Sequence, residues 1–134
     1  MYYLDTNICS YYLSQKYPQV RARFIESDPE ELAISSIVAA ELAAGVENSN
    51  DIHREKNRSV LLAFLSRMQI LPWDEQAVWL FGQHKTRLWR SGKKIGEIDL
   101  LIGCQALAAK AVLVTNNTRE FERIEGLKLE NWVG

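Results

Sequence analysis

The sequence predicts an α/β domain in which a central, mostly parallel sheet of four to five strands is flanked by helices. Two observations lead to this prediction. Short runs of apolar and β-branched residues alternate with longer stretches whose apolar residues repeat at helical spacing. The 134 residues are 47% hydrophobic and 25% charged, an ordinary globular composition that suffices for one core. No linker or internal repeat interrupts the chain, so we expect one domain over residues 1–134.

The first segment predicts a strand and two helices. Residues 2–4 are apolar, and Asp5 after them is of a type that caps helices, here a helix over 8–13. Pro18 suits the first turn of a second helix over 19–26. A turn at Asp28-Pro29 should then lead into the next strand.

The middle of the chain predicts two strands with two helices between them. A strand over 32–34 precedes Ser35, which suits the cap of a helix over 37–46. A longer helix over 54–67 leads to a third strand over 69–71. The apolar face expected for the longer helix consists of Val60, Leu61, Phe64, Leu65 and Met68.

The last part predicts two helices, two strands and a short helical turn. An amphipathic helix is expected over 75–91, and a helix over 98–109 is apolar nearly all round, which predicts an interior position. A strand over 111–114, a turn of helix over 119–123 and an edge strand over 127–129 complete the domain. The apolar residues of the amphipathic helix are Val78, Trp79, Phe81 and Leu88.

Charge and cysteine content exclude several classes of protein. Sixteen basic and seventeen acidic residues give a net charge of −1, which argues against a protein that binds nucleic acid through overall positive charge. No apolar run approaches the ~18 residues needed to cross a bilayer, and the N-terminus has no basic segment typical of secretory signals. Cys9 and Cys104 lie in apolar stretches, which predicts buried, reduced thiols in a cytoplasmic protein.

Polar side chains follow the predicted strands where the carboxyl edge of the sheet should lie. Asp5 comes directly after the first strand, and Glu41 lies one turn into the helix after the second. Asp99 opens the apolar helix, and Asn117 and Glu120 follow the strand over 111–114. Ligands of open α/β sheets bind beyond the carboxyl ends of the strands, so we expect a site formed by these residues.

Each acid also has a purely structural interpretation. Asp5 suits a helix cap, and Asp99 suits the first turn of a helix, where a negative charge is favourable. Glu41 lies in a very apolar helix, where a carboxylate must be paired, protonated or bound to a cation. An ion pair with an arginine is the structural alternative for Glu41.

A divalent cation would neutralise the clustered acids. Mg²⁺ prefers oxygen ligands and usually takes one or two carboxylates together with waters and substrate phosphate, and Mn²⁺ suits the same ligands. No cluster of His and Cys is present for zinc, since His53 and His84 lie far apart in the sequence and are expected at the surface. We therefore predict a Mg²⁺ or Mn²⁺ site.

A basic run precedes Asp99 and predicts an RNA-binding surface, because lysine and arginine hold phosphates. A solvated helix face is the structural alternative. Trp89 lies within the run, where packing is favoured over stacking on a base, and Arg54, Lys56 and Arg58 form a smaller basic group. The basic run consists of Lys85, Arg87, Arg90, Lys93 and Lys94.

Four motifs, in order along essentially the whole chain, resemble the PIN domain, and more narrowly the VapC toxins of bacterial type II toxin–antitoxin pairs. Each motif is weak alone, and the four together are specific. They are Tyr3-Leu4-Asp5-Thr6-Asn7, Ile34-Ser35-Ser36 with Ala40-Glu41-Leu42, Gly92-Lys93-Lys94-Ile95-Gly96 with Asp99, and Val114-Thr115-Asn116-Asn117-Thr118.

The resemblance implies a PIN-like fold and a Mg²⁺- or Mn²⁺-dependent endoribonuclease that leaves 5′-phosphate and 3′-hydroxyl ends. By motif position, Asp5, Glu41 and Asp99 match the acidic triad of the family. Many members carry a fourth acid where this chain has Asn117, which puts a second metal ion in doubt unless Glu120 or Glu97 compensates. The family places hydroxyl groups that support the acids at the positions of Thr6 and Thr115.

The resemblance also implies partners. VapC toxins pair with a small VapB antitoxin whose tail covers the site, usually form homodimers within larger toxin–antitoxin assemblies, and contact operator DNA only through the antitoxin. The segment Thr115–Phe121 is most similar to the enteric subgroup, whose members cut initiator tRNA in the anticodon loop. We accordingly expect a toxin that cleaves RNA, a tRNA substrate and no membrane contact.

Two other functions fit parts of the sequence. The absence of the fourth acid at Asn117 suits a non-catalytic PIN-like module that binds RNA or protein. A phospho-receiver domain is a weaker alternative, suggested by Asp74 after a strand, but the expected acid pair and late lysine are missing. No glycine-rich phosphate loop is present, which argues against a nucleotide-cofactor enzyme.

Overall fold

A single five-stranded parallel sheet with the strand order β3-β2-β1-β4-β5 forms the centre of the computed structural model, which describes residues 1–134. Every neighbouring pair of strands is parallel, which confirms and extends the expectation of a mostly parallel sheet. The strands are β1 (Tyr2–Leu4), β2 (Leu32–Ser35), β3 (Gln69–Leu71), β4 (Val112–Val114) and β5 (Lys128–Glu130).

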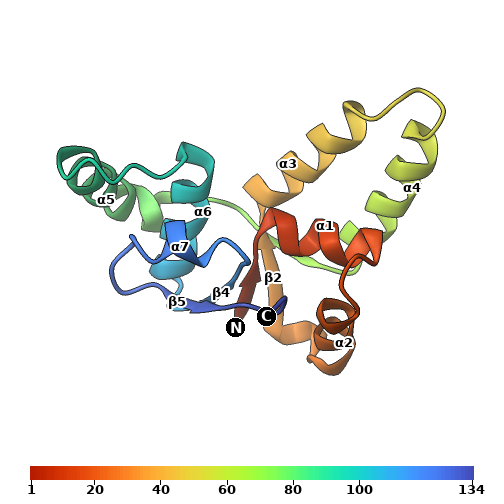
Figure 1. Cartoon of the computed structure of the whole chain (residues 1–134), viewed down its shortest axis with the longest axis horizontal. Coiled ribbons are helices and arrows are strands. Elements are labelled where there is room, and N and C mark those ends of the chain that lie inside the picture. The colour runs from red at the N-terminus through yellow and green to blue at the C-terminus, as the bar shows by residue number, and fades with distance from the viewer.

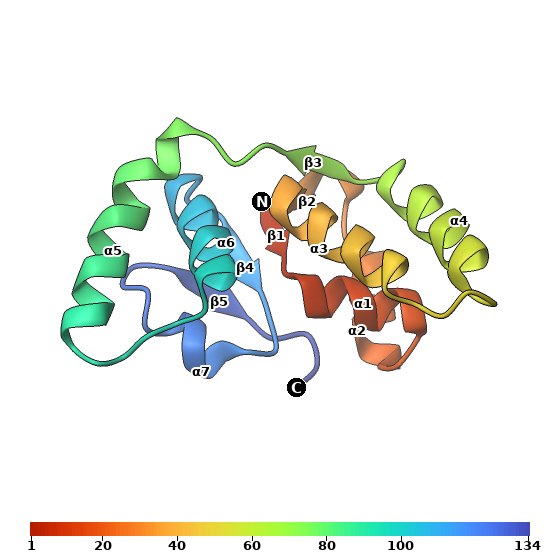
Figure 2. The same cartoon turned by 90° about the horizontal axis from the view of Figure 1, so that it is seen from above.

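Seven α-helices and two short 3-10 turns connect the strands. Figures 1 and 2 show α1–α4 on one side of the molecule and α5–α7 on the other, with the sheet between them. Seen from above, α3 and α6 are neighbours near the centre, while α4 and α5 lie at the two far ends. The helices are α1 (Thr6–Ser14), α2 (Pro18–Glu26), α3 (Ser36–Glu47), α4 (Arg54–Leu65), α5 (Val78–Arg90), α6 (Glu97–Ala108) and α7 (Thr118–Phe121); the 3-10 turns are η1 (Pro29–Glu31) and η2 (Glu75–Ala77).

The predicted elements are all present, and the differences lie at their ends. Helix α1 begins at Thr6 because Asp5 caps it, its Oδ1 accepting from the Ile8 N–H at 2.9 Å. The segment expected to be one helix over 75–91 begins as η2, capped by Asp74, and continues as α5. Helix α6 begins at Glu97, so Asp99 is the third residue of its first turn.

The core is formed by the strands and by one side of each flanking helix. Helix α6 buries six residues, as its uniform apolarity predicts. Cys9 and Cys104 are buried and unpaired, as expected. The apolar faces of the other helices are narrower than predicted, because Val60, Val78 and Trp79 are exposed. No helix is long and apolar enough to span a bilayer.

The chain changes the direction in which it adds strands to the sheet at β1, in the centre of the sheet. From β1 the chain moves outward through β2 and β3, and it then crosses back to β4 on the other side of β1. Such a switch point is where the carboxyl ends of parallel strands leave an open crevice. Leu4 and Val114 are register partners, so the residues that follow them, Asp5 and Thr115, are adjacent at this edge.

Candidate metal-dependent nuclease site

Asp5 is the most enclosed of the predicted acids, with 5% of its surface exposed. Its Oδ1 caps α1, and its Oδ2 accepts a hydrogen bond from the Thr115 hydroxyl at 2.5 Å. The Thr115 oxygen in turn accepts from the Asn117 N–H at 2.9 Å. Asp5 therefore caps a helix with one carboxylate oxygen, and the Thr115 side chain, directly after β4, fixes the other.

Glu41 lies on α3, half-buried, and faces the start of α1. The Thr6 hydroxyl donates to its Oε1. No lysine or arginine forms an ion pair with Glu41, so the structural alternative of an arginine partner is wrong. Its carboxylate is oriented by a neutral hydroxyl and has no basic partner.

Asp99 and Glu120 bring two more carboxylates to the same edge. Glu120, in α7, accepts from the Asn117 amide at 3.2 Å. Asp99 is half-buried in the first turn of α6 and also has no ion-pair partner. Glu97 forms an ion pair with Lys85 and is mostly exposed, so of the two acids considered for the fourth position, Glu120 is the one held by Asn117.

The pKa values of Asp5 and Asp99 show that these acids interact. Burial raises the pKa of Asp5 to about 6, and the charges of Asp99 and Glu41 add to the rise, while the hydrogen bonds from Thr115 and Ile8 oppose it. Burial also raises the pKa of Asp99, and the charges of Glu120 and Glu41 contribute. The charges of four carboxylates from distant parts of the chain thus act at one place, and no lysine or arginine is paired with any of them.

The donor set fits a hard divalent cation that keeps part of its hydration shell. All the side chains offer oxygen atoms as metal ligands, and no lysine or arginine is paired with them. No three acidic, His or Cys side chains are grouped closely enough to hold a metal ion by themselves. Mg²⁺ typically uses one or two carboxylates with several waters, and this arrangement suits that mode of binding.

A groove of about 410 Å³ extends from the site between α1, α3 and α4. Glu41 and Thr6 lie at one end of it, and Lys56 of α4 also lines it. Sequence analysis grouped Lys56 with Arg54 and Arg58 and did not place it near Glu41. Its contact with this groove depends on how α4 packs against α3, which the sequence pattern does not specify.

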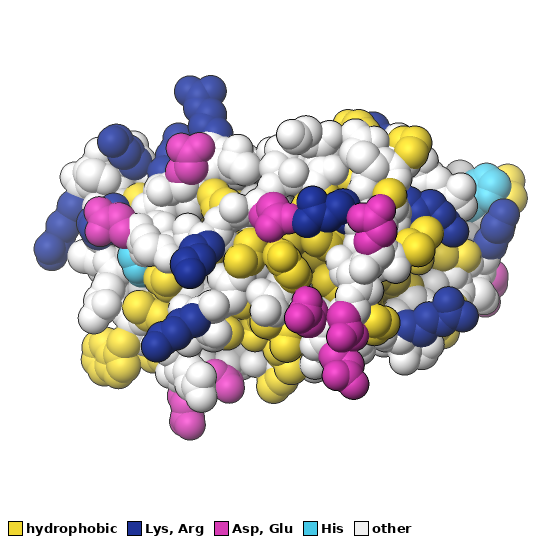
Figure 3. Space-filling view, turned by 90° about the horizontal axis from the view of Figure 1, so that it is seen from below, with side chains coloured by type: hydrophobic (Ala, Val, Ile, Leu, Met, Phe, Trp, Pro, Cys, Tyr) yellow, Lys and Arg dark blue, Asp and Glu magenta, His cyan; other side chains and the backbone are white.

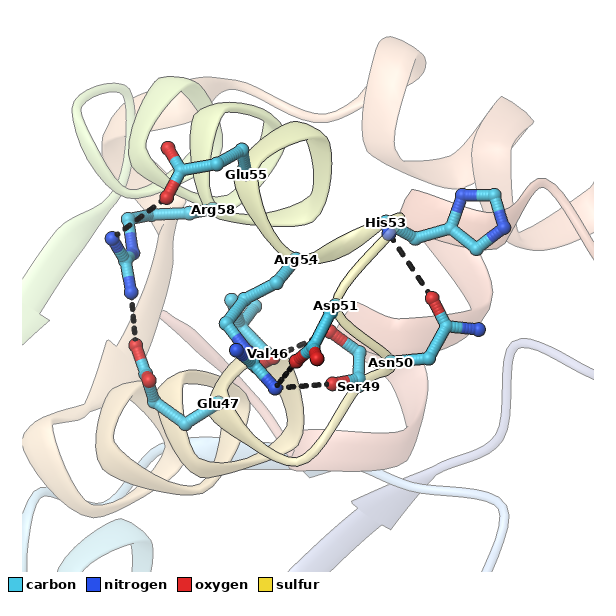
Figure 4. Close-up of polar contacts among 9 residues, drawn as sticks. All are labelled: Val46, Glu47, Ser49, Asn50, Asp51, His53, Arg54, Glu55 and Arg58. Carbon is cyan, nitrogen blue, oxygen red and sulfur yellow. Dashed lines mark hydrogen bonds and ion pairs between the residues drawn. The ribbon is translucent and has the colours of Figure 1, made fainter.

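The other two basic residues of α4 hold the α3–α4 connection together. Figure 4 shows Arg58 between Glu47 and Glu55, and Arg54 directed toward Asp51 and the Ser49 carbonyl. Because these guanidinium groups already have partners, Lys56 is the only residue of the group without an ion pair.

The basic run divides into paired and unpaired residues. Lys85 pairs with Glu97, and Arg87 donates to the Arg123 carbonyl at 2.7 Å and lies 3.8 Å from Glu125. The remaining three, Arg90, Lys93 and Lys94, are exposed and form no ion pair. Figure 3 shows acidic and basic side chains interspersed on the lower face, so the positive charge on this face lies in local groups.

The prediction that Trp89 packs into the protein is wrong. Its side chain is 67% exposed, because α5 contacts only α6 and η2 closely and buries a single residue, Leu88. Of the two histidines expected at the surface, His53 is exposed, and His84 is half-buried beside Arg87.

Comparison with known proteins shows one family and one fold for the chain. The profile of the PIN domain family matches residues 2–127. The chain is 44% identical over 134 residues to ribonuclease VapC2 of Rickettsia felis, covering 98% of each chain, and 40% identical to the tRNA(fMet)-specific endonuclease VapC of Shigella flexneri, covering 96% of each. Its structure superimposes with a TM-score of 0.89 and 42% identity, over 98% of each chain, on the VapBC2 complex of Rickettsia felis bound to a fragment of its promoter DNA.

Proposed function

We propose that this chain, which belongs to the PIN domain family and within it to the VapC ribonucleases, cleaves RNA with the help of a divalent cation held by Asp5, Glu41 and Asp99. VapC proteins are the endoribonuclease toxins of toxin–antitoxin pairs, and the chain is one of them. The observation that supports the cation is the convergence of acids with no basic partner, and the raised pKa values of Asp5 and Asp99 agree with it.

Each acid has a neighbour that orients it. Thr115 holds Asp5, Thr6 holds Glu41, and Asn117 holds Glu120 close to Asp99. Mg²⁺ or Mn²⁺ bound there would activate a water and stabilise negative charge on the phosphoryl oxygen. Because the supporting groups are neutral, they fix geometry without reducing the charge that attracts the cation.

The substrate that we propose is tRNA. The Shigella flexneri relative is named for cleavage of tRNA(fMet), and the present chain shares 40% of its sequence. Lys56 in the groove and the unpaired Arg90, Lys93 and Lys94 provide positive charge for the phosphate backbone on two sides of the acids.

The partner that we propose is a VapB-type antitoxin, because the similar structures are VapBC complexes. A tail of the antitoxin lying in the groove between α1, α3 and α4 would cover Glu41 and Lys56 and so block access of RNA. We further propose a homodimer and contact with operator DNA through the antitoxin alone. Sedimentation of the purified chain alone tests the homodimer, and sedimentation with the antitoxin tests the toxin–antitoxin complex.

Cleavage of bulk tRNA tests the site. The Asp5→Asn and Asp99→Asn variants should lose at least about a hundredfold in rate with Mg²⁺, since several kcal/mol of transition-state stabilisation depend on the cation. Excess EDTA should abolish cleavage by the wild type, and added Mn²⁺ should restore it. Asp74→Asn is the matched control, because Asp74 also follows a strand but only caps η2. Wild-type rates in both site variants would contradict the proposal.

The alternative of a non-catalytic binding module rests only on Asn117. Its amide holds Glu120 at the site, so the negative charge missing at position 117 is supplied from α7. Expression in a bacterial host separates the two functions, since a ribonuclease toxin arrests growth in a way that the Asp99→Asn variant does not.

A further inference from the structure

A pocket of about 320 Å³ lies between α5 and the first turn of α6, with Glu97 and Leu100 of that turn among its lining residues. Its apolar base is formed by Leu88, Ile95 and Leu100, which are buried. Trp89 forms one wall and is two-thirds exposed. An open indole beside a preformed apolar pocket is costly in water, and it offers a flat surface to a planar ligand.

Positive charge lies at the rim of this pocket. Lys85 and Lys94 line it, and the Lys85 ammonium neutralises the Glu97 carboxylate through their ion pair. Lys94 is held in place by its backbone, because its carbonyl accepts from Arg123 at 2.6 Å, while its ammonium group is unpaired. A planar apolar surface with one unpaired ammonium group beside it, that of Lys94, matches the chemistry of a nucleobase attached to a phosphate.

The pocket and the acids are joined by a very short segment of chain. Leu100 lines the pocket, and Asp99, the preceding residue, belongs to the acidic site. Consecutive residues of a helix point about 100° apart, so the two features lie on adjacent sides of one helical turn. A strand of RNA with a phosphate at the acids therefore passes the pocket with a neighbouring nucleotide.

We propose that Trp89 stacks on an unpaired base of the RNA substrate, with Lys94 at the adjoining phosphate. This inference rests on the proposed cleavage of RNA and adds a subsite that positions the strand. It predicts that the protein prefers RNA whose bases are unstacked, as in a loop, over continuous double helix, where no base is free to enter.

Binding of bulk tRNA in EDTA, where no cleavage occurs, tests the subsite. Trp89→Ala should raise the Kd about tenfold, Trp89→Phe should raise it less, and the dependence of Kd on salt should not change, since no phosphate contact is lost. Lys94→Gln should instead reduce the salt slope by about one. Trp79→Ala is the matched control, because Trp79 is 78% exposed on the same helix but does not line this pocket.

A second measurement follows the indole directly. Binding of tRNA should quench tryptophan fluorescence in the wild type and in the Trp79→Phe variant, and the quenching should largely disappear in Trp89→Phe. An unchanged Kd in Trp89→Ala overturns the proposal, as does a failure of the wild type to bind tRNA. If Trp89→Ala instead changes only the sedimentation of the chain, the indole contacts protein and the proposal is also overturned.

The two proposals fail separately. Wild-type cleavage of tRNA together with normal binding by Trp89→Ala removes the stacking subsite and leaves the ribonuclease. Absence of any Mg²⁺-dependent cleavage by the wild type removes the proposed activity itself.

Discussion

The Thr115 hydroxyl donates to Asp5 Oδ2 at 2.5 Å and accepts from the Asn117 N–H at 2.9 Å, so one buried side chain connects the ends of β1 and β4. Thr115 is completely buried, and its two hydrogen bonds leave it only one geometry. The orientation of the Asp5 carboxylate is thus set by the strand that lies next to it in the sheet.

Replacing Thr115 by valine should destabilise the fold and change the pH profile. Asp5 Oδ2 and the Asn117 N–H would lose their partner in a buried place, which costs about 2 kcal/mol of unfolding free energy. In the wild type, the hydrogen bond from Thr115 lowers the pKa of Asp5. Without this bond the pKa would rise above about 6, and the acid limb of the pH–rate profile of tRNA cleavage would move to higher pH. Urea unfolding and a pH–rate profile measure the two effects. Thr115→Ser keeps the hydroxyl and should retain both properties; a Val variant with an unchanged profile would contradict this role of Thr115.

Removing the charge of Asp5 should stabilise the protein when no divalent cation is present. The folded pKa of about 6 lies above the ordinary 3.8, so the folded state binds more protons between these values and stability falls as pH rises from about 4 to 6. The cost at pH 7 is about 3 kcal/mol. Asp5→Asn keeps a side chain that caps α1, and its unfolding free energy should exceed that of the wild type by an amount that grows over this pH range. If the unfolding free energies of the wild type and Asp5→Asn changed with pH in the same way in EDTA, burial would not penalise the charged form of Asp5.

A carboxylate at position 117 should make the protein more dependent on the cation. In the wild type, the Asn117 amide donates to Glu120 at 3.2 Å. In Asn117→Asp this donor is replaced by a second carboxylate, which repels that of Glu120. The melting temperature in EDTA should fall, and the increase on adding Mn²⁺ should be larger than in the wild type, since the cation binds only the folded state. Glu120→Gln, which removes a charge, should show the opposite change. Equal Mn²⁺ responses in all three proteins would place residues 117 and 120 outside the cation site.

Lys56 and Arg58, two residues apart on α4, should behave differently. Lys56 lines the same groove as Glu41, so Lys56→Gln should weaken tRNA binding whatever the RNA sequence and reduce its salt dependence. Arg58 is held by Glu47 and Glu55, so Arg58→Gln should lower the melting temperature slightly and leave binding unchanged. Titration of bulk tRNA at several salt concentrations distinguishes them. Equal losses of binding would mean that RNA contacts the whole helix.

The candidate acids could be found in the sequence because each stands out from its immediate neighbours. Their convergence could be predicted because the carboxyl ends of parallel strands meet at one edge of the sheet. A carboxylate after a strand, as in Asp5, or within an apolar helix, as in Glu41, is visible in one sequence. The parallel sheet then places strand ends together without further information. The hydroxyl contacts of Thr6 and Thr115 were reached only through the family resemblance, and the structure supplies their partners.

The surroundings of the site were less predictable, because they depend on packing between helices. Helical spacing shows which residues of α5 share a face, but it does not show that this helix packs closely only against α6 and η2, which leaves Trp89 and Trp79 exposed. The pairing of Lys85 with Glu97, and the presence of Lys56 in the groove that Glu41 lines, likewise depend on the angle between neighbouring helices. A basic run in the sequence therefore overestimates how many of its charges are free.

The residues joined at the centre of the sheet, Asp5 and Thr115, are 110 positions apart in the chain. A polypeptide still being synthesised holds Asp5 from the start but has neither Asp99 nor β4 until most of its length has left the ribosome. The carboxylate of Asp5 thus gains its hydroxyl partner and its neighbouring acid only after most of the chain has been made, so the acidic cluster assembles late in synthesis.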